Sequence, residues 1–81
     1  MSIEETALKP TLIYIRNYIQ QKGFSPSIRD ILGDLHTNHN YGYSTSFVHY
    51  CLVQLEKYGY IKRDKGIARS IRLTKKGLLY K

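Results

Sequence analysis

The sequence predicts an α+β fold in which a three-helix core is followed by a two-stranded β-hairpin. Apolar residues recur at helical spacing in three stretches before Gly59. After Gly59 the pattern changes to short alternating segments, which are typical of strands. A chain of 81 residues has apolar material for one core only, so we expect a single domain over residues 1–81, with its core at about 10–73.

The first predicted helix covers about residues 10–22. Residues 1–9 contain little apolar material and are expected to be a mobile lead-in or a short preliminary turn. Pro10 suits the first helical position and Gly23 suits the stop. The broad apolar stripe of this helix indicates a core element, formed by Leu12, Ile13, Ile15, Tyr18 and Ile19. We expect Phe24, in the break that follows, to point into the core as well.

The second predicted helix is short and covers residues 28 to about 35. Ser27 offers a side-chain oxygen to the exposed amides at its start, and Asp30 follows at the spacing of a capping box. Asp30 also suits the positive end of the helix dipole. The residues expected to face inward are Ile28, Ile31, Leu32 and Leu35, whereas Arg29 is expected to stay outside.

The third predicted helix covers residues 44–58, after a polar loop at 36–43. Ser44 is the expected N-cap, and Gly59 provides the stop. Val48, Leu52 and Leu55 form an apolar stripe with Cys51 beside it, so this face should be buried. The first turns of this helix are expected to expose polar and aromatic side chains, namely those of Thr45, Ser46, Phe47, His49 and Tyr50.

Two short alternating segments, residues 60–63 and 70–73, are predicted to pair as a hairpin. Ile61, Ile71 and Leu73 share one face, and the connection at 64–69 makes a basic tip. Residues 74–81 combine lysines with apolar side chains in a basic tail that is too short to assign.

The charge is concentrated at the C-terminal end of the chain. Residues 1–56 hold four basic residues against five acidic ones, whereas residues 57–81 hold nine basic residues against Asp64 alone. This asymmetry favours a polyanionic partner, nucleic acid before membrane, because no basic amphipathic helix with a large apolar face accompanies the charge. A solvated, solubilising tail is the alternative interpretation.

The order of three helices and a basic hairpin is that of a winged helix-turn-helix. Several segments resemble the N-terminal DNA-binding domain of LexA repressors: the serine-rich start followed by Val48 and His49, and residues 25–31, 52–61, 63–64 and 69–73. These 81 residues contain no counterpart of the family's C-terminal self-cleaving Ser/Lys peptidase domain. The resemblance therefore implies neither self-cleavage nor dimerisation through that domain.

The resemblance implies a sequence-specific regulator of transcription, expected to be a repressor, that binds double-stranded DNA. Helix 44–58 would enter the major groove, and wing 62–72 would contact the backbone. The residues expected to read bases are Ser44, Thr45, Ser46, Phe47, His49 and Tyr50. The residues expected to contact the DNA backbone are Arg29, Lys62, Arg63, Lys65 and Arg69. Phe47 and Tyr50 could instead be core or interface aromatics.

DNA binding is not the only function that a winged helix can serve. A winged helix can also present helix three or its wing to an acidic protein partner, such as a transcription component. His36, His39, His49 and Cys51 are possible metal ligands, but their spacing is not a standard zinc pattern, so no metal and no cofactor is expected. An enzyme is the least favoured class, because neither a phosphate-binding glycine loop nor a nucleophile elbow is present.

The expected assembly and compartment follow from simple features of the chain. A homodimer on DNA is possible, and Leu78, Leu79 and Tyr80 could supply a small contact for it. The single cysteine excludes an internal disulfide, and no apolar run approaches the length of a membrane span. A cytoplasmic protein without a small-molecule substrate is therefore expected.

Overall fold

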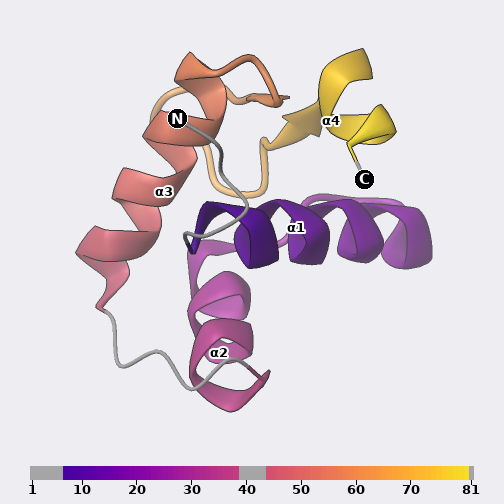
Figure 1. Cartoon of the computed structure of the whole chain (residues 1–81). Helices are drawn as coiled ribbons and strands as arrows, with labels where there is room; N and C mark the ends of the chain where they lie inside the picture. The colour runs from indigo at the N-terminus through magenta and orange to yellow at the C-terminus, as the bar shows by residue number, and fades with distance from the viewer. Residues whose placement is uncertain (1–6, 39–43, 81) are drawn as a thin grey trace.

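The computed structural model describes residues 7–38 and 44–80 of the chain. The elements follow in the order α1 (Leu8–Lys22), α2 (Ile28–Asn38), α3 (Thr45–Lys57), β1 (Ile61–Lys62), β2 (Arg72–Leu73) and α4 (Lys75–Leu79). In Figure 1, α1 runs across the directions of α2 and α3, and the hairpin and α4 lie on the other side of α1 from α2. The predicted α+β winged arrangement is confirmed.

The first helix begins earlier than the sequence indicated. Leu8 is the first helical residue, and Ala7 and Leu8 are buried, so the prediction of a lead-in was wrong for residues 7–9. Pro10 still lies in the first turn, where the amide that proline lacks would have no helical partner. Gly23 ends the helix as predicted: its φ of 81° is left-handed, and its N–H donates to the Ile19 carbonyl at 2.8 Å.

The start of the second helix is a reciprocal capping box, as predicted. The Asp30 amide donates to Ser27 Oγ at 3.1 Å, and the Ser27 amide donates to Asp30 Oδ2 at 2.9 Å. The helix continues to Asn38, so its predicted end at Leu35 was too early and residues 36–38 are helical rather than part of a loop. The rest of that predicted loop, residues 39–43, lies outside the described residues.

Phe24 does not point into the core, which corrects the prediction. Its side chain is 51% exposed and meets the Tyr18 ring edge-on, with centroids 5.7 Å apart. Ser25 and Pro26 take the inward positions of this break. The Ser25 hydroxyl accepts a hydrogen bond from the Ile71 amide at 3.2 Å, so the inward position of this break is occupied by a hydrogen-bonded polar side chain.

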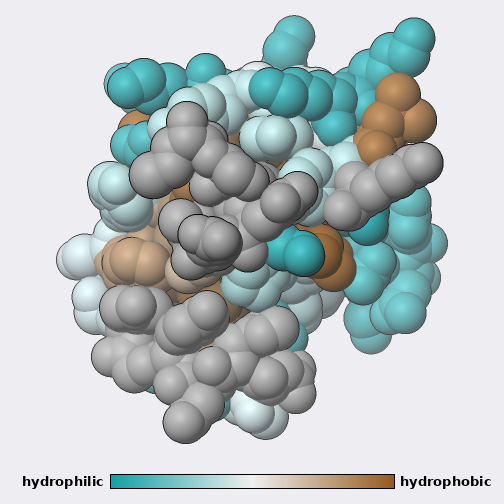
Figure 2. Space-filling model, viewed as in Figure 1, coloured by the Kyte–Doolittle hydropathy of each residue, from teal (hydrophilic) through white to brown (hydrophobic). Residues whose placement is uncertain are grey.

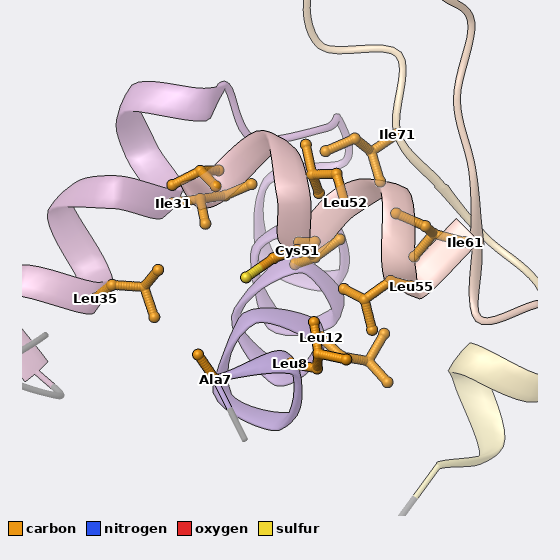
Figure 3. Packing of buried hydrophobic residues seen from close by; sticks show 12 residues of the cluster. Ala7, Leu8, Leu12, Ile31, Leu35, Cys51, Leu52, Leu55, Ile61 and Ile71 are labelled. Carbon is orange, nitrogen blue, oxygen red and sulfur yellow. The ribbon is translucent and has the colours of Figure 1, made fainter. Parts of the chain in front are cut away.

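The core lies where the three long helices and the hairpin meet. Figure 3 shows Cys51, Leu52 and Leu55 of α3 directed toward side chains of the other elements. The buried apolar residues are Ala7, Leu8, Leu12, Ile15, Ile31, Leu35, Val48, Cys51, Leu52, Leu55, Ile61 and Ile71. The predicted inward stripe of α3 is therefore confirmed. Ile28 and Leu32 of α2 are partly buried against the same cluster.

The predicted basic tail contains a fourth helix. Thr74 caps α4 by accepting a hydrogen bond from the Gly77 amide at 3.1 Å, and its hydroxyl donates to the Gly59 carbonyl. Gly77 is buried, and a β-carbon there would collide with the Tyr60 carbonyl, so the absence of a side chain lets α4 pack beside β1. No helix in the described part of the chain is long and apolar enough to cross a membrane.

Candidate nucleic-acid interface

Helix α3 has a buried face and an exposed polar face. Val48, Cys51, Leu52 and Leu55 are buried, and the burial of Cys51 raises the pKa of its thiol. Ser44 adopts an extended conformation at the N-cap, but its side chain makes no capping hydrogen bond. Side chains that can donate or accept hydrogen bonds are thus displayed around the first turns of the helix, and these exposed residues are Ser44, Thr45, Ser46, His49 and Tyr50.

The two aromatic residues predicted to read bases differ in burial. Tyr50 is 56% exposed, whereas Phe47 is partly buried and packs against the core cluster. Their ring centroids are 6.0 Å apart. Phe47 therefore packs against the core beside Tyr50, and Tyr50 is the more exposed of the two rings.

A groove of about 540 Å³ lies between α3, the first turn of α2 and the hairpin. Its floor is largely apolar and includes Pro26, Ile28 and Leu52. Several of the predicted site residues line it together, although they come from distant parts of the chain: Arg29, His49, Arg63, Lys65 and Arg69. The remaining predicted residues, Ser44, Thr45, Ser46, Phe47, Tyr50 and Lys62, do not line it.

The predicted cations fall into two groups according to their partners. Within residues 7–38 and 44–80, Arg29, Lys62 and Lys65 form no ion pair and are exposed. Arg63 Nε lies 3.2 Å from Glu56 Oε1, and only 18% of its side chain is exposed. The three unpaired cations can bind an anion without first breaking an ion pair with a carboxylate. Figure 2 shows hydrophilic side chains along the upper edge of the molecule, over the end of α3, the hairpin and α4.

The hairpin, which we call the wing and define as residues 61–73, is held together mainly by side chains. Its ladder has only two antiparallel pairs, Ile61 with Leu73 and Lys62 with Arg72. The Ser70 hydroxyl bridges its two arms, because it donates to the Asp64 carbonyl at 3.1 Å and accepts from the Asp64 amide at 3.0 Å. Gly66 takes a left-handed φ of 76° at the tip, and Lys65 and Ile67 on either side of it are exposed.

Arg69 turns back from the wing onto the helices. Its Nη1 atom lies 3.0 Å from the Ser25 carbonyl, 3.2 Å from the Tyr18 hydroxyl and 3.3 Å from Asp30 Oδ2. Its guanidinium carbon is 5.4 Å from the centroid of the Phe24 ring. We call these five residues, Tyr18, Phe24, Ser25, Asp30 and Arg69, the wing-root cluster. The contacts of Tyr18 and Ser25 could not be predicted from local patterns, because their partner Arg69 lies 51 and 44 positions further along the chain.

The pKa of Asp30 is lowered from its ordinary value. The main cause is the hydrogen bond from the Ser27 amide, and the Ser27 hydroxyl, the Arg69 charge and the Tyr18 hydroxyl act in the same direction. A carboxyl group with a lowered folded-state pKa stabilises the fold above its unfolded-state pKa. That contribution is lost as the pH falls through the folded-state value.

We therefore expect Asp30→Asn to destabilise the domain near neutral pH and much less in acid. The difference in free energy of unfolding between wild type and variant should shrink from about pH 4 downward, because the Asp30 carboxylate then takes up its proton. Urea titrations of both proteins at a series of pH values would measure it. A difference that stays constant down to about pH 2 would contradict this account of the Asp30 charge.

Metal-binding groups do not gather in the described part of the structure: no three of its His, Cys, Asp and Glu side chains form a cluster that could hold a metal ion. Of the possible ligands noted in the sequence, Cys51 is buried and His49 is exposed on the groove. His39 lies outside the described residues.

The domain is a winged helix-turn-helix. Its third helix exposes polar residues in its first turns, and a groove separates this helix from the basic wing. The family described as LexA DNA binding domain matches residues 6–70. The chain belongs to this family.

Several proteins named LexA repressor are similar to this chain over most of its length. A LexA repressor of Thermosipho melanesiensis is 43% identical over 65 residues, which are 80% of this chain and 30% of that protein. LexA repressors of Herpetosiphon aurantiacus and Clostridium kluyveri are 42% and 40% identical, over 74% and 78% of this chain and 26% and 29% of their own lengths. The chain thus spans less than a third of these relatives.

Proposed function

We propose that this protein is a sequence-specific double-stranded DNA-binding repressor of transcription that acts by occupying its site. The observation that carries the proposal is the groove, where cations from α2 and the wing lie beside the exposed polar face of α3. The family and the names of the relatives support the same function.

The exposed face of α3 suits the major groove of DNA. That groove accepts an α-helix and presents donors, acceptors and thymine methyl groups on the base edges. Ser44, Thr45, Ser46 and His49 can form hydrogen bonds to base edges, and the Tyr50 ring can contact a methyl group. The opposite face of α3 is buried in the core. We therefore propose that the exposed polar face reads the bases.

The groove between α3 and the wing suits one strand of the DNA backbone. With α3 in the major groove and the wing near the adjacent minor groove, the intervening strand would pass between them. Arg29 of α2 and Lys65 of the wing both line this groove and can bind phosphates, while its apolar lining can contact sugars. Arg63 also lines this groove, whereas Lys62 lies outside it and would add positive charge elsewhere on the wing.

Titration of labelled duplexes tests this proposal directly. Selection of bound sites from random duplexes should return a defined sequence, and that sequence should bind more tightly than unrelated DNA. If no duplex binds even at low salt, the proposal is lost. The alternative of a protein-interaction module would then be supported by salt-resistant capture of an acidic partner in the absence of nucleic acid.

We expect Ser46→Ala and His49→Ala to change sequence preference more than overall affinity. Both side chains are exposed on α3, and loss of one base contact typically costs about 1 to 3 kcal/mol at the matching base pair. Repeating the selection with each variant should relax the preference at one or two positions. Uniform weakening on every sequence would instead show that these residues hold the backbone.

Two copies on a two-fold DNA site would fit the usual way in which helix-turn-helix proteins gain specificity. Of the residues predicted for such a contact, Leu78 and Leu79 are 49% and 66% exposed. Tyr80 instead packs edge-on against Tyr60, with ring centroids 5.6 Å apart. We therefore place the proposed contact on Leu78 and Leu79 alone, and light scattering of the DNA complex tests it.

A further inference from the structure

The backbone of Arg69 has a conformation that few non-glycine residues adopt. Its φ is 55°, and it is the one non-glycine residue with a positive φ among residues 7–38 and 44–80. A left-handed conformation is unfavourable for an arginine and persists only where surrounding contacts fix it. The contacts that fix it here are those of the wing-root cluster.

The side chain of Arg69 is oriented by contacts on several sides. One nitrogen, Nη1, lies within 3.3 Å of oxygen atoms of Tyr18, Ser25 and Asp30, and the guanidinium lies over the Phe24 ring. The guanidinium donates hydrogen bonds to the Tyr18 hydroxyl and the Ser25 carbonyl, and it forms an ion pair with Asp30. One nitrogen of Arg69 therefore contacts α1, α2 and the connection between them.

The partners of Arg69 belong to the helical body and not to the wing. Tyr18 is in α1, Phe24 and Ser25 form the connection from α1 to α2, and Asp30 is in the capping box of α2. The neighbouring wing residue Ile71 donates its amide to the Ser25 hydroxyl. Two successive attachments therefore join the second arm of the wing to the same short connection.

The wing needs such attachment, because its own ladder is small. Two residue pairs do not make an independently stable hairpin. The separation of Lys65 from Arg29 and His49, which sets the width of the groove, depends on where the wing is held against the helices.

We propose that Arg69 is a positioning residue: it fixes the wing against α1 and α2, and it supports DNA binding through the placement of the wing without holding a phosphate itself. This inference rests on the proposed function. A positioning role and a direct phosphate contact predict different results. They differ in how DNA affinity depends on salt and in whether substitution of Tyr18, which does not line the groove, lowers that affinity.

The decisive experiment is a double-mutant cycle of Arg69→Gln and Tyr18→Phe, with affinity for a selected duplex measured over a range of salt concentrations. We expect Arg69→Gln to lower affinity about tenfold and Tyr18→Phe about threefold, with little further loss in the double variant, because both act through one cluster. The slope of log affinity against log salt should stay at the wild-type value in all three.

Arg72→Gln is the matched control. It removes the same charge from the same arm of the wing, where Arg72 pairs with Asp64 at 3.5 Å and is 65% exposed. We expect it to lower affinity about twofold at most, through long-range electrostatics. Circular dichroism melts would show that each variant is folded at the temperature of measurement.

A direct phosphate contact by Arg69 would give a different pattern and overturn the proposal. Arg69→Gln would make the salt slope less negative by about one, and the Tyr18→Phe and Arg69→Gln effects would multiply.

Amide hydrogen exchange tests the attachment without DNA. We expect exchange of the Ile71 amide to become about tenfold faster in Arg69→Gln, while that of buried Leu55 in α3 is unchanged. Unchanged Ile71 exchange would overturn the positioning role, whether or not the protein binds DNA. A wild-type protein that binds no duplex would remove the proposed function, and the exchange result would still show whether Arg69 fixes the wing.

Discussion

Replacing Leu55 by alanine will lower the free energy of unfolding by about 3 kcal/mol. Leu55 is fully buried in α3, and Figure 3 shows it between Leu12 of α1 and Ile61 at the start of the wing. The substitution removes apolar contacts and leaves a cavity that three different elements would have to close. A domain of this size has a total stability of about 4 to 12 kcal/mol, so the loss is a large share of it.

Urea or thermal unfolding followed by circular dichroism would measure this loss. Val53→Ala is the matched control, because Val53 lies on the same helix and is 47% exposed. We expect it to change stability by about 0.5 kcal/mol or less. A Leu55→Ala protein as stable as the control would mean that α3 is not packed in the core as described.

Replacing Arg29 and Lys65 together by glutamine will weaken binding to every DNA sequence by about 30-fold at moderate salt. The two cations line the groove from different elements, α2 and the wing, and neither is paired with a carboxylate in the described structure. Loss of about 1 kcal/mol for each phosphate contact gives this factor. The salt slope should become less negative by about two, since each contact releases about one counterion.

Fluorescence anisotropy with a selected duplex and an unrelated one, over several salt concentrations, would separate these effects. The ratio of the two affinities should change little, because phosphates carry no sequence information. A Lys22→Gln, Lys75→Gln protein is the control, since it loses the same charge at residues that do not line the groove. Equal weakening in both double variants would show that only net charge matters, and not this groove.

The helices and most of their boundaries could be predicted because their signals are local. The capping box of Ser27 and Asp30 lies within one turn of sequence, and the stripe of Val48, Leu52 and Leu55 reports helical spacing directly. Charge pattern and order of elements also indicated a basic wing. These features define which side chains α3 buries and which it exposes.

The errors concern residues whose environment is set by distant partners. Phe24 was expected in the core because it is apolar, but Ser25 and Pro26 occupy the inward positions and Arg69 covers its ring. The α4 helix could not be assigned because its place depends on Thr74 and Gly77 meeting the exit of α3. The expectation that Arg69 contacts the DNA backbone stays a prediction, but its contacts with Tyr18 and Asp30 could not be predicted because no local pattern indicates them.

The hydrogen bond from the Ile71 amide to the Ser25 hydroxyl has a consequence for how the chain folds. Its two residues are 46 positions apart, so closing it costs substantial chain entropy, whereas the helical turns and the α2 cap form locally. The helices must largely assemble before the α1–α2 connection offers Ser25 to the wing. We therefore expect the wing to dock late in folding and, in the folded protein, to open at lower free-energy cost than the helical core.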